Sequence, residues 1–151
     1  MNDTVLTRTS LFQNHLDLGA KMVAYSFYEM PVSYAGIKEE HQTVRNSVGV
    51  FDVSHMGEIE VSGPQSLDFL NSSLTNDLNK CSLGQAQYTL LCDEQGGTLD
   101  DLLVYRWTEN EYTLVVNASN EQKDWDWLNS QNKFDCKLEN QSDDICLFAV
   151  Q

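Results

Sequence analysis

The sequence has few basic residues. Its 151 residues include 9 lysines and arginines against 23 aspartates and glutamates, which gives a formal net charge of −14. Nucleic-acid binding depends on clustered Lys and Arg side chains that contact phosphates. The sequence has no five-residue basic run, so its charge argues against a nucleic-acid partner.

Long hydrophobic runs are also missing. No apolar run reaches the ~18 residues that indicate a transmembrane helix, and the first four residues lack the basic-then-apolar pattern of a signal peptide. The four cysteines have no C-x-x-C spacing, which argues against a structural zinc site or another metal site. We expect free, mostly buried thiols in a reducing compartment, and therefore a cytoplasmic protein with no membrane partner.

Common catalytic motifs are absent as well. The sequence has no nucleophile elbow, P-loop or dinucleotide fingerprint, and Gly96-Gly97 is typical of a turn rather than of a phosphate-binding loop. Only two prolines occur, with no internal repeat and no Pro- or Ser-rich linker. Nothing indicates an internal domain boundary, and the length fits one domain or a piece of a larger protein.

Hydrophobic residues make up 41% of the chain, and their pattern predicts both helices and strands. Ile37, His41, Val44 and Val48 repeat at helical spacing, with Gly49 as the expected cap. Further helices are expected from a capping box at 62–65 to about residue 71, and from 119 onward. Extended segments or strands are predicted at 21–34, 50–53, 58–61, 88–92, 99–107, 112–116, 136–138 and 145–150.

Turns at 93–97 and 109–111 make residues 88–116 a three-stranded meander. Strands interleaved with about three helices, and hairpins among the strands, predict an α+β fold with a mainly antiparallel sheet. The last segment, 145–151, is apolar up to the final residue and has no closing turn. We therefore expect a truncated chain.

Two adjacent carboxylates, Asp100 and Asp101, interrupt an apolar segment that is otherwise typical of a strand. Asp is disfavoured in strands, and a buried carboxylate without a partner is costly. The pair therefore indicates either an edge strand with both carboxylates in water or a pocket that uses a negative charge. Alternation along a strand places Asp101 on one face with Leu103 and Tyr105, and Asp100 on the other among aliphatic residues. The aromatic neighbour suits a flat heterocycle, so we favour Asp101 over Asp100.

Other candidates near this strand are open to two interpretations. Tyr88 lies on the neighbouring strand and is more typical of a core or interface residue. Asn117 ends the next strand and could contact a ligand or cap the following helix, although Ser119 could also cap it. Met56 is more typical of a core residue.

The three histidines form no evident constellation. His55 could act as a base, but no carboxylate or nucleophile partner follows from the spacing. His15 and His41 are weaker candidates, and His41 is best interpreted as a helix-face residue with a polar tip.

Several longer runs are specific in combination. They are Glu-Met-Pro-Val-Ser-Tyr at 29–34, Phe-Asp-Val-Ser-His-Met at 51–56, Leu-Thr-Asn-Asp at 74–77, Gly-Gln-Ala-Gln-Tyr at 84–88, Gly-Gly-Thr-Leu-Asp-Asp-Leu-Leu-Val-Tyr at 96–105 and Val-Val-Asn-Ala-Ser-Asn at 115–120. In these runs, and nearly from end to end, the chain resembles the T-protein family, the aminomethyltransferases of the glycine cleavage system.

The resemblance implies an enzyme that uses tetrahydrofolate as co-substrate and the lipoylated H-protein as partner. It implies transfer of a one-carbon unit from the aminomethyl-dihydrolipoyl group to tetrahydrofolate, with release of ammonia. Family members are much longer, so residues 1–151 correspond to the N-terminal folate-binding portion, without the C-terminal portion. The family's catalytic aspartate corresponds to Asp101. The positions that line the family's folate pocket correspond to Met56, Tyr88, Leu103, Tyr105 and Asn117.

One departure and two alternatives accompany the resemblance. Tyr-Ser-Phe-Tyr at 25–28 stands where the family commonly has a Phe-Ala-Gly-Trp-like run. The same superfamily includes non-catalytic folate-binding modules, which usually carry a Lys-Gly-Cys motif that is not seen here. It also includes folate-dependent demethylases and the folate domains of amine-oxidising flavoenzymes. The Asp-Asp pair and the Asp-Val-Ser-His-Met run favour a catalytic protein.

Overall fold

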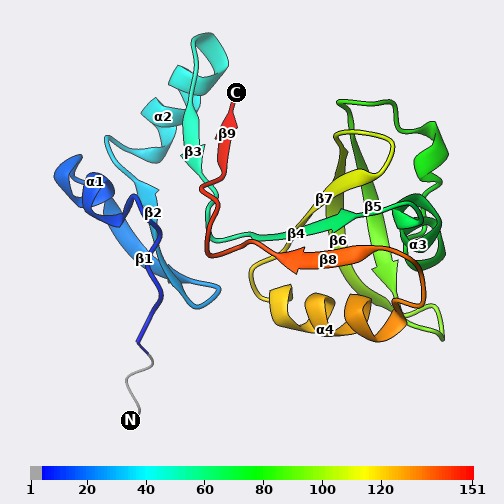
Figure 1. Cartoon of the computed structure of the whole chain (residues 1–151). Coiled ribbons are helices and arrows are strands. Elements are labelled where there is room, and N and C mark those ends of the chain that lie inside the picture. The colour runs from blue at the N-terminus through cyan, green and yellow to red at the C-terminus, as the bar shows by residue number, and fades with distance from the viewer. Residues whose placement is uncertain (1–4) are drawn as a thin grey trace. The chain divides into compact units, whose positions relative to one another are not determined.

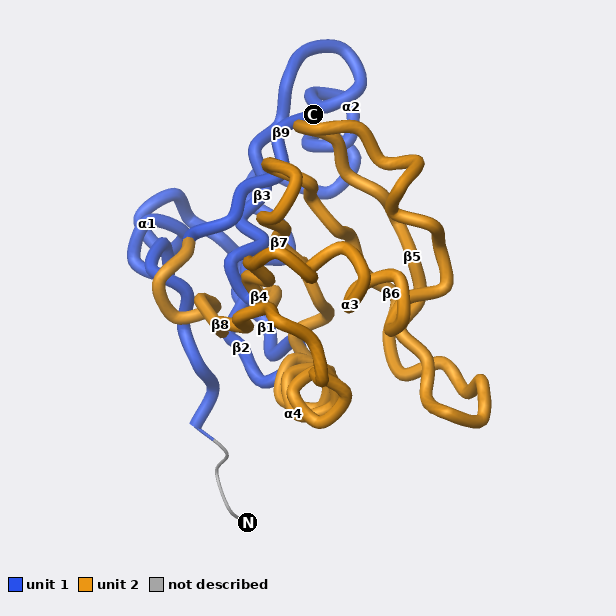
Figure 2. Tube along the Cα trace, turned by 45° about the vertical axis from the view of Figure 1, so that its right-hand side comes forward, with its two compact units in different colours: residues 1–55, 146–151 blue, residues 56–145 orange. Residues whose placement is uncertain are grey.

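The last strand of the chain pairs with a strand that ends its first third. In the computed structural model, which describes residues 5–151, β3 (Val50–Asp52) runs antiparallel to β9 (Phe148–Val150). This pairing joins residues 146–151 to the segment that ends at His55, as unit 1 (Figure 2). Residues 56–145 form unit 2 (Figure 2). The sequence carries no signal of this division, because neither boundary contains a linker-like stretch.

Unit 1 contains a hairpin, two helices and the β3–β9 pair (Figure 1). Its remaining elements are α1 (Phe12–Asp17), β1 (Lys21–Tyr25), β2 (Tyr28–Ser33) and α2 (Ile37–Asn46). The segment expected to be extended, 21–34, is the antiparallel β1–β2 hairpin. Its turn residues Ser26 and Phe27 both have positive φ, at 42° and 70°. This is the sign pattern of a type I′ turn, so the run that departs from the family pattern lies at the tip of a hairpin.

Helix α2 confirms the predicted helix but not its cap. The helix ends at Asn46, and Gly49 instead pairs with Gln151, donating from its N–H at 2.8 Å and accepting at 3.0 Å. At the start, the Glu40 carboxylate accepts the N–H groups of Tyr34 and Gly36 at 2.8 and 2.7 Å, which satisfies backbone donors at the helix N-terminus.

Unit 2 contains a five-stranded antiparallel sheet with two α-helices on one face. Its elements are β4 (Gly57–Ser62), α3 (Ser66–Ser73), a 3₁₀ turn η1 (Leu78–Lys80), β5 (Ala86–Cys92), β6 (Thr98–Arg106), β7 (Glu111–Val116), α4 (Glu121–Gln131) and β8 (Lys137–Asn140). The strand order is β5-β6-β7-β4-β8. The predicted meander of β5, β6 and β7 is confirmed by the ladders Tyr88–Leu103 and Leu103–Val115. The α+β, mainly antiparallel fold class is therefore confirmed (Figure 1).

The core of unit 2 lies between one face of the sheet and the helices. Alternate strand residues such as Ile59, Val104 and Leu114 are fully buried, and they belong to the same cluster as Phe69 of α3 and Leu128 of α4. Because neighbours on a strand point to opposite faces, this packing leaves the other set of β5–β7 residues on the face away from the helices.

Three details of the sequence prediction were wrong. The capping box at 62–65 does not form: α3 begins at Ser66, and Gly63 has a φ of 129°, which is not a helical value. Helix α1 was not predicted, so the described residues contain four α-helices rather than three. The cysteines are free thiols, but only Cys81 is buried and Cys146 is exposed.

Within residues 5–151, none of the helices has the length and apolar character needed to cross a membrane.

Candidate functional site

The two adjacent aspartates of β6 lie in opposite environments in unit 2. Asp100 is only 4% exposed on the helix-covered face, whereas Asp101 is exposed on the other face. The predicted alternation is therefore confirmed, because Leu102 and Val104 are buried with Asp100 while Leu103 and Tyr105 are half-buried on the side of Asp101. Only Asp101 can present its carboxylate to a molecule bound on the face away from the helices.

Tyr88 connects the Asp101 carboxylate to the neighbouring strand. Its hydroxyl donates a hydrogen bond of 2.8 Å to Oδ2 of Asp101. The bond to Asp101 raises the pKa of the Tyr88 phenol, with smaller contributions from burial and from the aspartate charges. The phenol therefore stays a proton donor at neutral pH and fixes one carboxylate oxygen. Tyr88 is 57% exposed, which rules out a core position, whereas its interpretations as an interface residue and as a folate-pocket residue stay predictions.

Aromatic rings continue along the same face of β6. Tyr105 lies stacked on Trp107, with ring centroids 5.7 Å apart and an interplanar angle of 13°. The Trp107 indole N–H donates to the Thr113 hydroxyl at 2.8 Å, which fixes the ring although it is 56% exposed. From the sequence alone Trp107 is interpreted only as a core or surface aromatic residue, yet its period-two spacing from Asp101, Leu103 and Tyr105 places it on this face of the strand.

Asn117, directly after β7, is in contact with both aspartates. Its side-chain amide donates to Oδ1 of Asp100 at 2.8 Å, and it also reaches the backbone carbonyl of Asp101 at 3.0 Å and Oδ1 of Asp101 at 3.4 Å. One amide nitrogen has two hydrogens, so the two contacts to Asp101 share one of them. Neither Asn117 nor Ser119 caps α4, because Asn120 occupies the position before the helix.

Asp100 is the buried anchor below this arrangement. It accepts the backbone N–H of Asn117 at 3.0 Å and the side-chain amide of Asn120 at 2.6 Å, and it shares a hydrogen bond with Asp124 of α4. Burial alone would raise the pKa of Asp100, but the bonds from Asp124, Asn117 and Asn120 together hold it below its usual value. Asp124 was missed from the sequence. The available signal was an aspartate four residues before the buried Leu128, on the helix face that packs on the sheet.

Met56 lies at the same end of the sheet as Asn117. It precedes Gly57, which pairs with Val116, the residue before Asn117. Its side chain is half-buried. The structure thus gathers Tyr88, Asp101, Leu103, Tyr105 and Asn117 around one strand of unit 2, with Met56 next to the end of that cluster in the sheet register.

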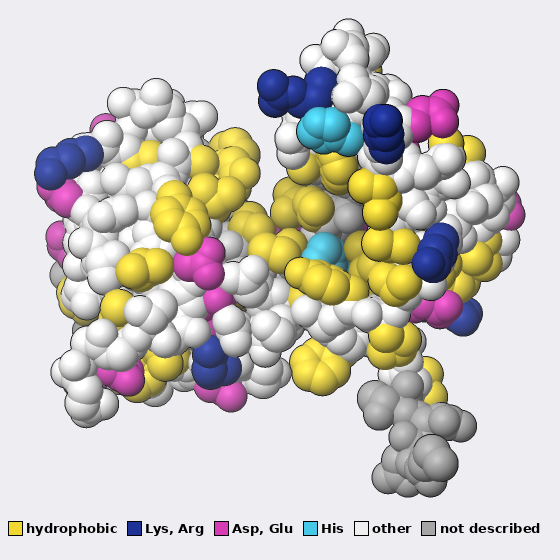
Figure 3. Space-filling view, turned by 180° about the vertical axis from the view of Figure 1, so that it is seen from behind, with side chains coloured by type: hydrophobic (Ala, Val, Ile, Leu, Met, Phe, Trp, Pro, Cys, Tyr) yellow, Lys and Arg dark blue, Asp and Glu magenta, His cyan; other side chains and the backbone are white. Residues whose placement is uncertain are grey.

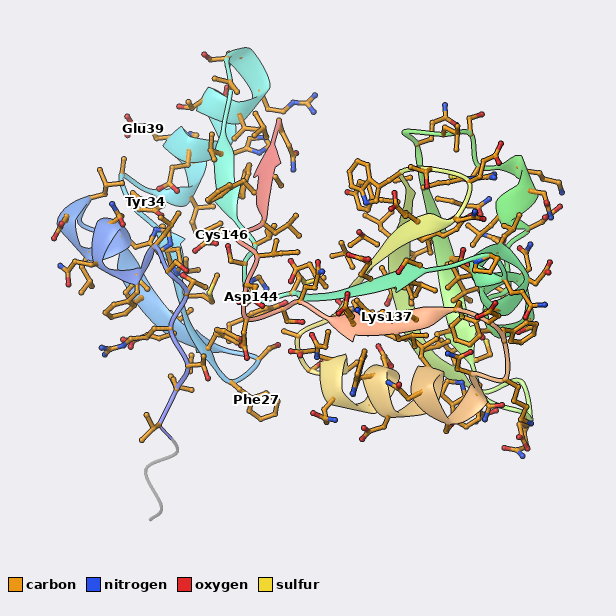
Figure 4. All side chains as sticks on the ribbon, in the orientation of Figure 1. Phe27, Tyr34, Glu39, Lys137, Asp144 and Cys146 are labelled. Carbon is orange, nitrogen blue, oxygen red and sulfur yellow. The ribbon has the colours of Figure 1, made fainter. Side chains whose placement is uncertain are left out.

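All three histidines belong to unit 1, whereas the residues around Asp101 belong to unit 2. His15, the weaker candidate from sequence, is 5% exposed and bonds Asp52 at 2.9 Å through Nε2 and the Tyr34 hydroxyl at 2.8 Å through Nδ1. Tyr34, which is labelled in Figure 4, belongs to unit 1, as do His15 and Asp52. His55 packs edge-on against Tyr25, and burial lowers its pKa, although the charge of Asp52 opposes that effect. The hydrogen bond between His15 and Asp52 connects α1 to β3 within unit 1.

Unit 1 also exposes many large apolar side chains (Figure 3). The apolar stripe predicted for α2 is among them, since Ile37 is 71% exposed and Val48 is 55% exposed. A hollow of about 640 Å³ lies beside this helix. Its lining includes Val32, Val44 and Phe51 but none of the residues around Asp101.

Comparisons with known proteins bear on the whole chain. Residues 11–151 match a family model described as the GCVT N-terminal domain. The aminomethyltransferase of Exiguobacterium sibiricum is 54% identical over 151 residues, which is all of this chain and 42% of that protein. The aminomethyltransferase of Lysinibacillus sphaericus is 50% identical over 147 residues, covering 97% of this chain and 40% of that protein.

A solved structure agrees with these matches. The glycine cleavage system aminomethyltransferase T from Bartonella henselae superposes with a TM-score of 0.90 at 36% identity, over 97% of this chain and 40% of that one. The chain therefore spans about two fifths of the length of the relatives it matches.

Proposed function

The chain belongs to the GCVT N-terminal domain family, and from this premise we propose that it carries the folate-binding face and the catalytic carboxylate of an aminomethyltransferase. The proposed reaction moves a one-carbon unit from the aminomethyl-dihydrolipoyl group of H-protein to tetrahydrofolate and releases ammonia. Residues 1–151 act as the N-terminal folate-binding portion of such an enzyme. Both the relatives' names and the arrangement around Asp101 support this proposal.

The exposed face of β5 and β6 fits a flat heterocycle beside a carboxylate. The exposed rings of Tyr88 and Trp107 offer aromatic surface, and Leu103 and Tyr105 lie half-buried next to them. Stacking on such rings is favourable for any planar ring system, and a few polar groups then fix its orientation. When bound, tetrahydrofolate supplies the nitrogen atoms that accept the one-carbon unit. Asn117 and Met56 lie at one end of the sheet and form the edge of this face.

Asp101 is the proposed catalytic residue. Positive charge develops when an amine leaves a carbon that is bound to nitrogen, and a fixed carboxylate stabilises that charge more in the transition state than in the ground state. Tyr88 and Asn117 hold the Asp101 carboxylate before any ligand binds, so little reorganisation is needed. The same carboxylate can accept an N–H of the attacking ring and orient it.

The observation that carries this proposal is the position of the Asp101 carboxylate. It is exposed, fixed by a 2.8 Å bond from Tyr88, and flanked by aromatic rings on the same face. A carboxylate in a turn or at an unstructured edge would not meet all three conditions.

The test is a calorimetric titration of the 151-residue chain with tetrahydrofolate, followed by a turnover assay with aminomethylated H-protein. We expect saturable binding by the wild-type chain and by Asp101→Asn, with turnover reduced at least about 100-fold in the variant. Asp126→Asn removes an exposed carboxylate from α4 and is the matched control. Normal turnover by Asp101→Asn would refute the catalytic role. Absence of binding by a chain with a cooperative thermal transition would refute the folate-binding role of this portion.

A further inference from the structure

Two carboxyl groups meet inside unit 2, below the exposed face. Asp124 of α4 is 0% exposed and Asp100 of β6 is 4% exposed, and the two groups share a hydrogen bond. An ionised carboxylate can only accept hydrogen bonds, so two ionised groups cannot form this contact. Like charges so close in a buried place also disfavour double ionisation. The pair must therefore hold one proton.

The surrounding donors decide which carboxyl group carries the proton. Asp100 accepts N–H bonds from the backbone and side chain of Asn117 and from the side chain of Asn120, all of which stabilise its anion. Among the described residues, no N–H or O–H donor reaches either carboxyl oxygen of Asp124. The proton therefore belongs to Asp124, which donates it to Asp100.

The charged groups that bear on Asp124 agree with this assignment. They are Asp100 from the sheet and Lys123 from the same helix. The Lys123 ammonium is turned away to the Leu99 carbonyl at 2.6 Å and to the Asn120 side-chain oxygen at 3.0 Å, so it does not neutralise Asp124. Burial, followed by the bond to Asp100 and its charge, raises the pKa of Asp124 to about 8.

A continuous chain of hydrogen bonds leads from this proton to the candidate site. Asp124 holds Asp100, Asp100 holds the amide of Asn117, and that amide bonds both the backbone carbonyl and the carboxylate of Asp101. We infer that Asp124 is a positioning residue: its carboxyl proton fixes Asp100, which in turn orients the Asn117 amide against Asp101. The role of Asp101 in this inference rests on the proposed function, whereas the shared proton does not.

The chemistry of the proton separates positioning from simple packing. A leucine could fill the same buried volume without the cost of desolvating a carboxyl group, but it could not donate to Asp100. An asparagine keeps a donor and removes the ionisation. Asp124→Asn should therefore preserve the orientation of Asn117, and Asp124→Leu should not.

The first test is an NMR titration of the ligand-free chain from about pH 5 to about pH 10. We expect the Asp124 carboxyl carbon to titrate with a midpoint near 8, and the Asn117 side-chain amide to shift with the same midpoint. Asp124→Asn should remove that step while leaving the Asn117 amide at its wild-type position, and Asp126→Asn should leave the step intact. An Asp124 midpoint near the ordinary aspartate value, or an Asn117 amide that does not follow the titration, would overturn the inference.

The second test measures tetrahydrofolate affinity at about pH 7 and about pH 9. Wild-type affinity should fall by at least about ten-fold between these values, because ionised Asp124 repels Asp100 and releases Asn117. Asp124→Asn should bind with little pH dependence, and Asp124→Leu should bind weakly at both values. Equal affinity for all three proteins at both values would contradict the positioning role. If the wild-type chain does not bind tetrahydrofolate, the proposed function fails, and the NMR titration still decides whether Asp124 holds Asn117.

Discussion

Replacing Glu58 with glutamine should stabilise unit 2 at neutral and alkaline pH. Glu58 lies on β4 and is 1% exposed, and among the described residues neither of its carboxyl oxygens has a hydrogen-bond partner. Burial, and secondarily the charge of Glu121, raises the pKa of Glu58 from 4.5 to about 7. The folded protein thus keeps a proton that the unfolded chain releases through the interval from 4.5 to about 7.

The direction of the effect follows from proton linkage. Where the folded state binds more protons than the unfolded state, the free energy of unfolding falls as pH rises. Below pH 4.5 Glu58 is protonated in both states and does not lower the free energy of unfolding. Between pH 4.5 and about pH 7 its contribution lowers that free energy progressively, and above about pH 7 the penalty is constant. At 1.36 kcal/mol for each pH unit, that penalty is at most roughly 3 kcal/mol. Asp124 acts in the same direction, so only the difference between Glu58→Gln and wild type isolates Glu58.

Urea unfolding followed by tryptophan fluorescence is the suitable measurement. All three tryptophans, Trp107, Trp125 and Trp127, belong to unit 2, so the signal reports on that unit. We expect equal stability of the two proteins near pH 4.5 and a gain of about 2 to 3 kcal/mol for Glu58→Gln at about pH 8. Glu111→Gln, on the neighbouring strand and exposed, should give no such difference. A difference in the free energy of unfolding between Glu58→Gln and wild type that does not grow with pH would refute the reasoning.

Two further predictions concern unit 1. Asp52→Asn should destabilise the unit by roughly 2 to 4 kcal/mol at neutral pH. Burial would raise the pKa of Asp52, but bonds from His15, Ser54 and Thr9 outweigh it and lower the pKa. The stabilisation by Asp52 is therefore present above the ordinary aspartate pKa and is lost in more acidic solution. If acid lowered the thermal unfolding temperature of Asp52→Asn as much as that of the wild type, this prediction would be contradicted. Phe27→Gly should stabilise the β1–β2 hairpin by about 1 kcal/mol, because Phe27 has a φ of 70° and its ring is 66% exposed (Figure 4). Hydrogen exchange of the Val23 and Met30 amides measures this, and faster exchange in the variant would show that the Phe27 ring contributes more than its backbone costs.

The two faces of β6 could be predicted from sequence because strand geometry is local. A period of two places Asp101 with Leu103 and Tyr105 whatever the rest of the fold, and the exposures agree. The meander was predictable for the same reason, since turn residues between short apolar runs leave few alternatives. The same local rules failed at Gly49 and at 62–65, where a plausible cap was replaced by a long-range partner or by a positive φ.

Contacts between residues far apart in sequence could not be predicted. His15 and Asp52 are 37 residues apart, and nothing near either residue indicates that a buried hydrogen bond joins them. The apolar repeat of α2 shows a limit of periodicity. The period says which residues share a side of the helix but not whether that side is buried, and here Ile37 and Val48 are exposed.

Asp100 and Asp101 show why residue type alone is insufficient to assign chemistry. Both are aspartates on one strand, and each accepts more than one hydrogen bond. Asp100 is surrounded by donors in the interior, so its charge is satisfied and it serves to hold Asn117. Asp101 has donors on one side and an exposed face on the other, so its carboxylate still has acceptor capacity for a ligand. The proposed division of roles between the two therefore follows from which face of β6 the helices cover, and that depends on residues such as Phe69 and Leu128 far from both.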